Sequence, residues 1–172
     1  TGHWAGLADW EEELKPFYDL AKKMLGAAKH PYMSQNDKVM LSLAEEMGKK
    51  DDFEKTDVAV YFGKPGVTVS DPYFDGKGPD RTGCTLCGGC MVGCRYNSKN
   101  TLDKNYLHLA RQLGCEIISE KEVYDVKPVG TDGDGGYDIF FKDSLKWIKS
   151  HSRVRAKGVI FAGGVLGTVK LL

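Results

Sequence analysis

The stretch that decides the fold class is residues 157–172, which read KGVIFAGGVLGTVKLL. The continuous apolar run 157–162 predicts a strand, the paired glycines that follow predict a turn, and residues 165–172 have helical composition. A helix that starts this way leaves backbone N–H groups open to a phosphate at its positive end, with Thr168 in the first turn. The full G-x-G-x-x-G pattern is absent, so an ordinary strand-to-helix turn remains the alternative.

A strand meander is expected ahead of that stretch. Residues 121–129 and 137–141 are two strands separated by the glycine-rich loop 130–136, which is typical of a hairpin. Residues 145–148 are expected to add a third strand. Residues 115–119 form a short apolar strand that begins with Cys115, which is expected to be a buried core thiol.

Three amphipathic helices are predicted from apolar residues that recur every three or four positions. The first runs from Asp9 to residue 25, with a kink or a new helix start at Pro16. The second covers residues 39–47 and ends at Gly48, and the third covers residues 102–113.

These elements give an α+β or α/β layer fold. Residues 58–62 are a short strand, and the Pro- and Gly-rich stretch 63–83 is expected to be well-fixed irregular backbone. The chain divides by character into a helical and loop region at 1–83, a Cys-rich loop at 84–100, and a mixed sheet region at 101–172.

Composition excludes several function classes. The chain has 24 Lys and Arg against 24 Asp and Glu, so it lacks the net charge that general binding to nucleic acid or an acidic membrane requires. No stretch reaches the roughly 18 consecutive apolar residues of a membrane span. The first residues contain no secretory signal, and closely spaced thiols without one indicate a reducing compartment such as the cytoplasm.

Cysteines at 84, 87, 90 and 94 have C-x2-C-x2-C-x3-C spacing. Bacterial ferredoxins use this spacing to place three thiolates on one iron–sulfur cluster such as [4Fe–4S], with the fourth often serving another cluster, and the glycines between the ligands suit a chain that wraps a cluster. Arg95 stands where such motifs normally have proline, and the sequence has no second such motif. A zinc ion could use the same thiolates, and a metal-free loop or disulfides are the remaining alternatives. The candidate metal ligands are Cys84, Cys87, Cys90 and Cys94.

Taken in order, residues 90–107, 122–123 and 159–172 resemble the glucose–methanol–choline oxidoreductases, specifically the cholesterol oxidase branch. Residues 10–26 and 71–79 resemble segments that precede the cysteine stretch in that branch. The resemblance implies an FAD enzyme that oxidises a sterol or another small alcohol by hydride transfer to the flavin. It also implies an internal piece of a longer polypeptide without the catalytic pair, inactive alone and prone to self-association.

The resemblance implies that residues 1–83 belong to the region that covers the substrate and residues 101–172 to the FAD-binding domain. It carries over to few individual positions. Val123, after Glu122 on a strand, matches the place where the family's backbone meets the adenine edge, although a plain strand residue is the alternative. Gly163 and its neighbours match the turn beside the FAD diphosphate and ribose. The expected cofactor-binding residues are Glu122, Val123, Ala162, Gly163, Gly164 and Thr168.

Two other function classes remain open from sequence: a ferredoxin-like electron carrier built on the cysteines, and an interaction module with a structural zinc. Five aromatic residues are candidates to line a sterol-sized cavity, with core packing as the alternative: Trp4, Trp10, Phe17, Tyr73 and Phe74. The histidines have no partner at a useful spacing and are expected to be exposed or structural: His3, His30, His108 and His151.

Overall fold

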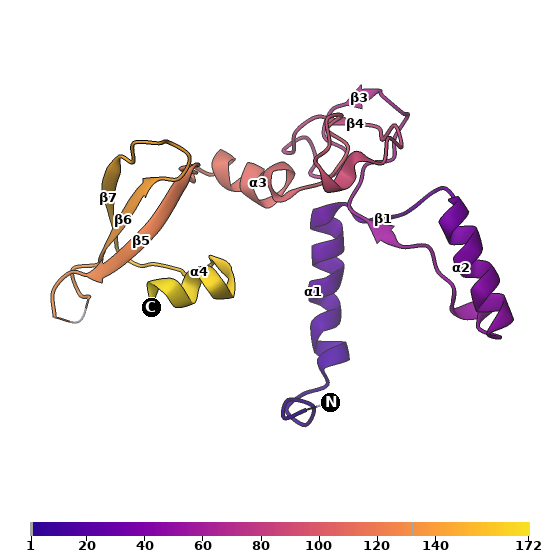
Figure 1. The fold of residues 1–172 in the computed structure, drawn as a ribbon, viewed down its shortest axis with the longest axis horizontal. Coiled ribbons are helices and arrows are strands. Elements are labelled where there is room, and N and C mark those ends of the chain that lie inside the picture. The colour runs from indigo at the N-terminus through magenta and orange to yellow at the C-terminus, as the bar shows by residue number, and fades with distance from the viewer. Residues whose placement is uncertain (1, 132) are drawn as a thin grey trace. The chain divides into compact units, whose positions relative to one another are not determined.

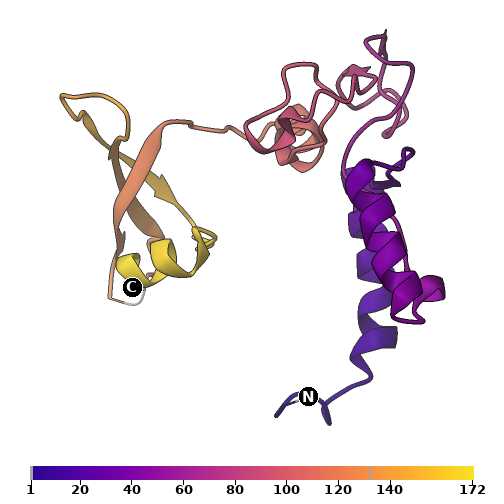
Figure 2. The same ribbon diagram turned by 45° about the vertical axis from the view of Figure 1, so that its right-hand side comes forward.

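The structure, a computed structural model, describes residues 2–131 and 133–172. The chain forms two compact units, one up to Cys115 and the other from Glu116 onward, and each is described by itself (Figures 1 and 2). Both contain helices and small antiparallel sheets, so the expected mixture of α and β structure is confirmed. In the described part of the chain, no helix combines the length and apolarity needed to cross a membrane.

Helix α1, Trp10–Leu25, opens the first unit. The Asp9 side chain accepts a hydrogen bond from the Glu12 N–H, and Gly26, at φ 53°, ends the helix in the left-handed conformation. Pro16 lies inside this single helix, so the expected second start is wrong. Proline removes one N–H donor, but its fixed φ is helical and the chain continues through it.

The other two helices also follow local signals. Helix α2, Gln35–Glu46, begins with a capping box between Ser34 and Asp37, and Gly48 follows it at φ 68°. The third predicted helix is split into a 3-10 turn, η3 (Leu102–Lys104), and α3 (Tyr106–Gln112). Asn105 divides them because its side chain accepts from the N–H of the next residue and caps α3.

Short strands and turns complete the first unit. Of the predicted strand at 58–62, only Val58, in β2 (Asp57–Val58), and an isolated bridge between Val60 and Lys99 are formed. Two antiparallel pairs are formed, β1 (Ala28–Lys29) with β2 (Asp57–Val58), and β3 (Thr68–Val69) with β4 (Arg81–Thr82). Two further 3-10 turns are η1 (Lys50–Asp52) and η2 (Gly89–Met91).

The stretch 63–83 is irregular, as expected, and the Asp71 carboxylate fixes much of it. This carboxylate accepts backbone hydrogen bonds from Tyr73 at 3.0 Å and from Phe74, Gly76 and Gly78 at 2.9 Å each. Burial raises the Asp71 pKa, but these four bonds outweigh it and hold the pKa below its usual value. A side chain therefore organises this turn where no ladder exists.

The second unit is a meander with the order β5–β6–β7 and a helix beside it (Figure 1). The predicted hairpin is confirmed, with part of its loop at residue 132 outside the described residues. A register shift between Val123 and Asp125 makes a bulge at Tyr124. The elements are β5 (Lys121–Pro128), β6 (Tyr137–Asp143), β7 (His151–Ala156) and α4 (Gly164–Leu171).

Three predicted strands are wrong. Residues 145–148 belong to the connection before β7, where Asp143 accepts a hydrogen bond from the Ser150 N–H at 3.3 Å and where Trp147 is 99% exposed. Residues 115–119 and 157–162 are irregular. Apolar composition alone does not make a strand, because a strand needs a neighbour to receive its backbone hydrogen bonds, and the described residues pair no strand with these segments.

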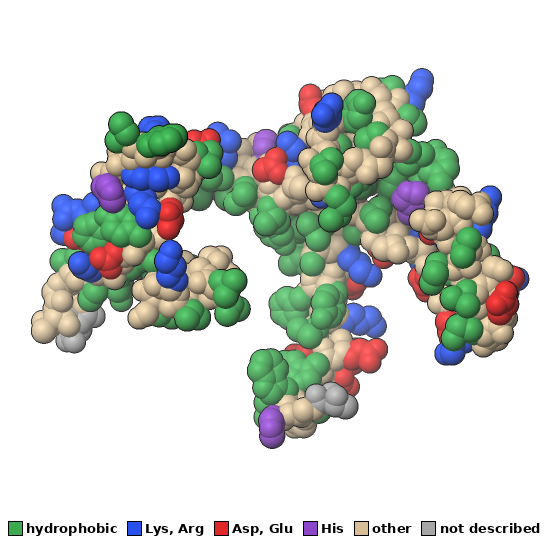
Figure 3. Space-filling view, in the orientation of Figure 1, with side chains coloured by type: hydrophobic (Ala, Val, Ile, Leu, Met, Phe, Trp, Pro, Cys, Tyr) green, Lys and Arg blue, Asp and Glu red, His purple; other side chains and the backbone are tan. Residues whose placement is uncertain are grey.

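Polar contacts dominate the interior of the described residues. Val60 is their only buried hydrophobic residue, and the space-filling view shows many exposed apolar side chains (Figure 3). Caps, turns and side chain-to-backbone hydrogen bonds therefore hold much of the first unit. The buried polar residues are Arg81, Ser98, Asn100, Asn105, Asp138 and Asp143.

Replacing Asp71 with Asn tests the four hydrogen bonds that its carboxylate accepts in the turn 71–78. The variant loses the charge on four hydrogen bonds, so we expect the free energy of unfolding to fall by about 1–2 kcal/mol at neutral pH. Hydrogen exchange at the Phe74 and Gly78 amides of the full-length protein measures this loss of stability. Asp75→Asn, at an exposed site in the same turn, is the control.

Wild type and Asp71→Asn can also be compared as a function of pH. Because the folded Asp71 pKa lies below its unfolded value of about 3.9, its stabilising contribution is complete above that value and is lost as pH falls through the folded pKa. The difference in stability between wild type and Asp71→Asn should shrink below about pH 4. A difference that stays constant to the lowest accessible pH would contradict this assignment.

Candidate functional site

The four cysteines of the spaced motif all line one pocket of about 620 Å³. The chain between them, residues 84–94, is called the cysteine loop below. Residues from distant parts of the first unit form the rest of the wall, and most of the lining is apolar. These wall residues include His30, Tyr32, Val58, Val60, Phe62 and Tyr96.

Cys84 is positioned by the strand pair that precedes it. Cys84 lies two residues after β4, and its N–H donates to the Tyr61 carbonyl at 2.9 Å. Leu86 adopts the left-handed conformation at φ 59°, and its N–H donates to the Cys84 Sγ at 3.4 Å. Gly88 and Gly93 also have positive φ, 74° and 105°, which suits glycine at both turns of the cysteine loop.

Cys94, at the other end of the loop, is surrounded by backbone donors. The Ser98 N–H lies 3.3 Å from its Sγ. Burial raises the pKa of the Cys94 thiol, but backbone N–H groups of Lys99, Ser98 and Tyr96 outweigh burial and lower the pKa below its usual value. The surroundings of Cys94 therefore favour the thiolate, the form that binds metals.

A buried cation supports this part of the loop. Arg81 is 1% exposed, and its guanidinium donates to the carbonyls of Asn97 at 3.0 Å and Lys99 at 2.9 Å. Burial lowers the pKa of Arg81, while the nearby Tyr73 and Cys94 act in the opposite direction. Arg81 thus fixes the backbone that presents the Ser98 N–H to Cys94 and places a positive charge near that thiol.

The cysteines do not close on a single ion. In the part of the chain that the structure describes, no group of three Cys, His, Asp or Glu side chains could hold a metal ion. Cys84, Cys87, Cys90 and Cys94 form no disulfide, and Cys87 and Cys90 are exposed. Cys115 is also exposed, which corrects the expectation of a buried core thiol, because the strand predicted at 115–119 is not formed.

His30 was missed by the sequence pattern. Its Nδ1 lies 2.9 Å from the Tyr32 carbonyl oxygen, and its ring meets Phe62 edge-to-face with centroids 5.4 Å apart. The fold thereby places this histidine in the wall of the cysteine pocket. Spacing could not indicate this, because the motif begins 54 residues further along the chain.

The residues predicted to bind a cofactor gather in the second unit. Glu122 and Val123 lie near the start of β5, an edge strand of the sheet, and Gly163 is the N-cap of α4. Lys170 of α4 approaches Glu122, with Nζ and Oε1 3.7 Å apart, so the helix and the strand are neighbours. Thr168 lies in the second turn of α4, one turn later than predicted.

The backbone at the start of α4 is open. A Cβ on Gly163 would meet its nearest atom at 3.8 Å, and one on Gly164 would meet nothing within 4 Å. Gly164 has φ 70°, and Gly163 gives the helix no side-chain cap. Ala162 and both glycines are exposed. Together with the free edge of β5, this bare main chain suits a nucleotide that needs close backbone approach.

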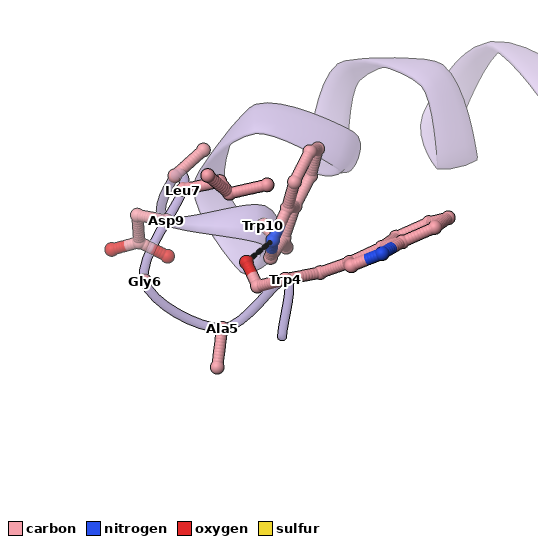
Figure 4. Close-up of a pocket in the computed structure, with 7 residues that line it drawn as sticks. Trp4, Ala5, Gly6, Leu7, Asp9 and Trp10 are labelled. Carbon is pink, nitrogen blue, oxygen red and sulfur yellow. Dashed lines mark hydrogen bonds between the residues drawn. The ribbon is translucent and has the colours of Figure 1, made fainter. Parts of the chain in front are cut away.

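A second hollow lies at the N-terminal turn, where residues 4–10 enclose about 660 Å³. The Trp10 indole N–H donates to the Trp4 carbonyl at 2.7 Å (Figure 4). Phe17, Tyr73 and Phe74, the other aromatics proposed for a sterol cavity, do not line it. Because seven consecutive residues make this hollow, it is a feature of one turn.

Comparison with known proteins covers nearly the whole chain. It is 41% identical to a cholesterol oxidase of Acinetobacter baumannii, over 99% of this chain and 32% of the relative. It is 40% identical to cholesterol oxidases of two Mycobacterium tuberculosis strains, CDC 1551/Oshkosh and H37Rv, over 98% of this chain and 30% of each relative. The chain is homologous to cholesterol oxidases.

This relationship confirms the resemblance to cholesterol oxidases. The chain spans about a third of the length of these cholesterol oxidases. No family model and no solved structure matches it. The relationship gives no support to a ferredoxin-like carrier or a zinc interaction module as the function of the chain.

Arg81 is the main residue of this cholesterol oxidase-like chain that sequence reasoning overlooked. We expect Arg81→Lys to lower the free energy of unfolding by about 2 kcal/mol, because a lysine cannot reach both carbonyls and leaves one unsatisfied. Hydrogen exchange at the Tyr61 and Asn100 amides measures this, with the exposed Arg111→Lys as the control. Equal protection in both variants would show that the guanidinium does not hold this backbone.

Proposed function

We propose that the protein carrying this chain is an FAD-dependent oxidoreductase that oxidises a sterol or another small alcohol to the carbonyl compound. The observation that carries the proposal is the identity of 40–41% with cholesterol oxidases across almost the entire chain. The mixed α and β structure of the second unit is compatible with part of an FAD-binding domain.

The second unit would contact the nucleotide end of the cofactor. The backbone of Val123, on the edge strand beside Glu122, would meet the adenine, while Ala162, Gly163 and Gly164 would face the diphosphate and ribose. In support, both sets lie in one unit, and the start of α4 has no side chain that would obstruct a phosphate. Thr168 lies one turn further along α4 and would contribute to cofactor binding through its position on that helix.

When bound, FAD supplies the acceptor for the hydride that the alcohol carbon loses, and a base takes the hydroxyl proton. We assign neither role to a residue of this chain. Its own contribution is to bind and orient the nucleotide part of the cofactor. Since Cys84, Cys87, Cys90 and Cys94 lie close in sequence and form no disulfide, the cytoplasm is the compartment that we propose.

The full-length protein, purified and examined under nitrogen, tests the activity without knowledge of its natural electron acceptor. We expect a flavin absorption spectrum that bleaches when cholesterol is added, because the bound flavin becomes reduced. A simple primary alcohol serves as the comparison substrate. A preparation without flavin, or a flavin that neither compound reduces, would refute the proposed function.

Substituting Gly163 with Val tests the assigned binding turn. Since Gly163 has φ −81° and room for a Cβ, the chain can accept valine there, whereas the bulk would stand where the diphosphate approaches. We expect at least a tenfold weaker affinity for FAD, measured by fluorescence titration of the deflavinated full-length protein. Gly158→Val, a site that also has open space, is the matched control and should bind FAD like wild type.

A further inference from the structure

We propose that Cys84, Cys87, Cys90 and Cys94 bind a [4Fe–4S] cluster in the pocket that they line. This inference goes beyond the proposed function, which needs only the flavin. It begins from one observation: the four thiols, at C-x2-C-x2-C-x3-C spacing, line one pocket of about 620 Å³.

The spacing favours a cluster over zinc, because bacterial ferredoxins hold iron–sulfur cubes with the same run, and with no second run in this sequence the fourth thiolate is left for the same cube. A tetrahedral zinc ion bonds every thiolate at about 2.3 Å, so its four sulfur atoms must nearly touch. In a cubane, each thiolate bonds a different iron atom, and the sulfur ligands stand farther apart around a larger body. Four cysteines at this spacing around one pocket suit the second arrangement.

Hydrogen bonds at the two ends of the cysteine loop support the same assignment. The Leu86 N–H lies 3.4 Å from the Cys84 Sγ, and the Ser98 N–H lies 3.3 Å from the Cys94 Sγ. Backbone N–H groups that point at cysteine sulfur stabilise the thiolates of iron–sulfur sites and tune their potentials. The left-handed conformation of Leu86, rare for a residue with a side chain, directs one of these donors.

Charge and shielding also fit a cluster with four thiolate ligands. Such a site is anionic, and the buried guanidinium of Arg81 and the ammonium of Lys99 are the nearby positive groups. Lys99 donates to the Cys90 carbonyl at 2.9 Å and itself lines the pocket. Val60 and Phe62 contribute an apolar wall, which would limit solvent contact with a cluster.

Metal analysis of the full-length protein, purified without oxygen, tests the proposal. We expect about four iron and four acid-labile sulfide per chain, as the cluster formula requires, and an electron paramagnetic resonance signal after reduction with dithionite. One zinc without sulfide, or no metal after anaerobic reconstitution with iron and sulfide, would overturn it. Flavin is measured in the same sample, so flavin without iron defeats only this inference, and iron without flavin defeats only the proposed function.

Cysteine variants assign the ligands. We expect Cys84→Ser and Cys94→Ser each to lose at least half of the bound iron, while Cys115→Ser, outside the cysteine loop, keeps the full amount. Retained flavin and an unchanged circular dichroism spectrum show that a variant is folded. If a variant is misfolded, Cys87→Ser and Cys90→Ser at the exposed positions replace it. Full iron and sulfide in all folded variants would refute the assignment.

Discussion

The buried guanidinium of Arg81 is the contact on which the first unit depends most. It joins β4 to the carbonyls of Asn97 and Lys99, while the bridge between Lys99 and Val60 continues the connection to the strand region before it. A buried charge is costly unless its hydrogen bonds are made, and here main-chain oxygens make them. The cysteine loop is therefore closed at its base by β4 on one side and residues 97–99 on the other.

Local signals in the sequence were sufficient for several elements. Gly48 follows the end of α2 as expected, and the glycine-rich loop joins β5 to β6, because each of these features is determined by residues within a few positions. The strands expected at 145–148 and 157–162 failed for the opposite reason. Their apolar composition carried no information about a pairing partner.

The site shows the same division. Cysteine spacing indicated which thiols share a pocket, and the paired glycines indicated where α4 begins with open backbone. Neither Arg81 nor His30 could be predicted. Arg81 bonds main-chain oxygens 16 and 18 residues away, and oxygens of that kind occur at every position, so no residue type marks the partner. Homology to cholesterol oxidases then joins the two halves of the chain into one functional proposal.

The main-chain partners of Arg81 have a consequence for mutational tolerance. Its guanidinium bonds the carbonyl oxygens of Asn97 and Lys99, which a residue of any type supplies. The contact therefore requires arginine at position 81, whose fork of donors reaches both oxygens, but it places no requirement on the side chains at 97 and 99.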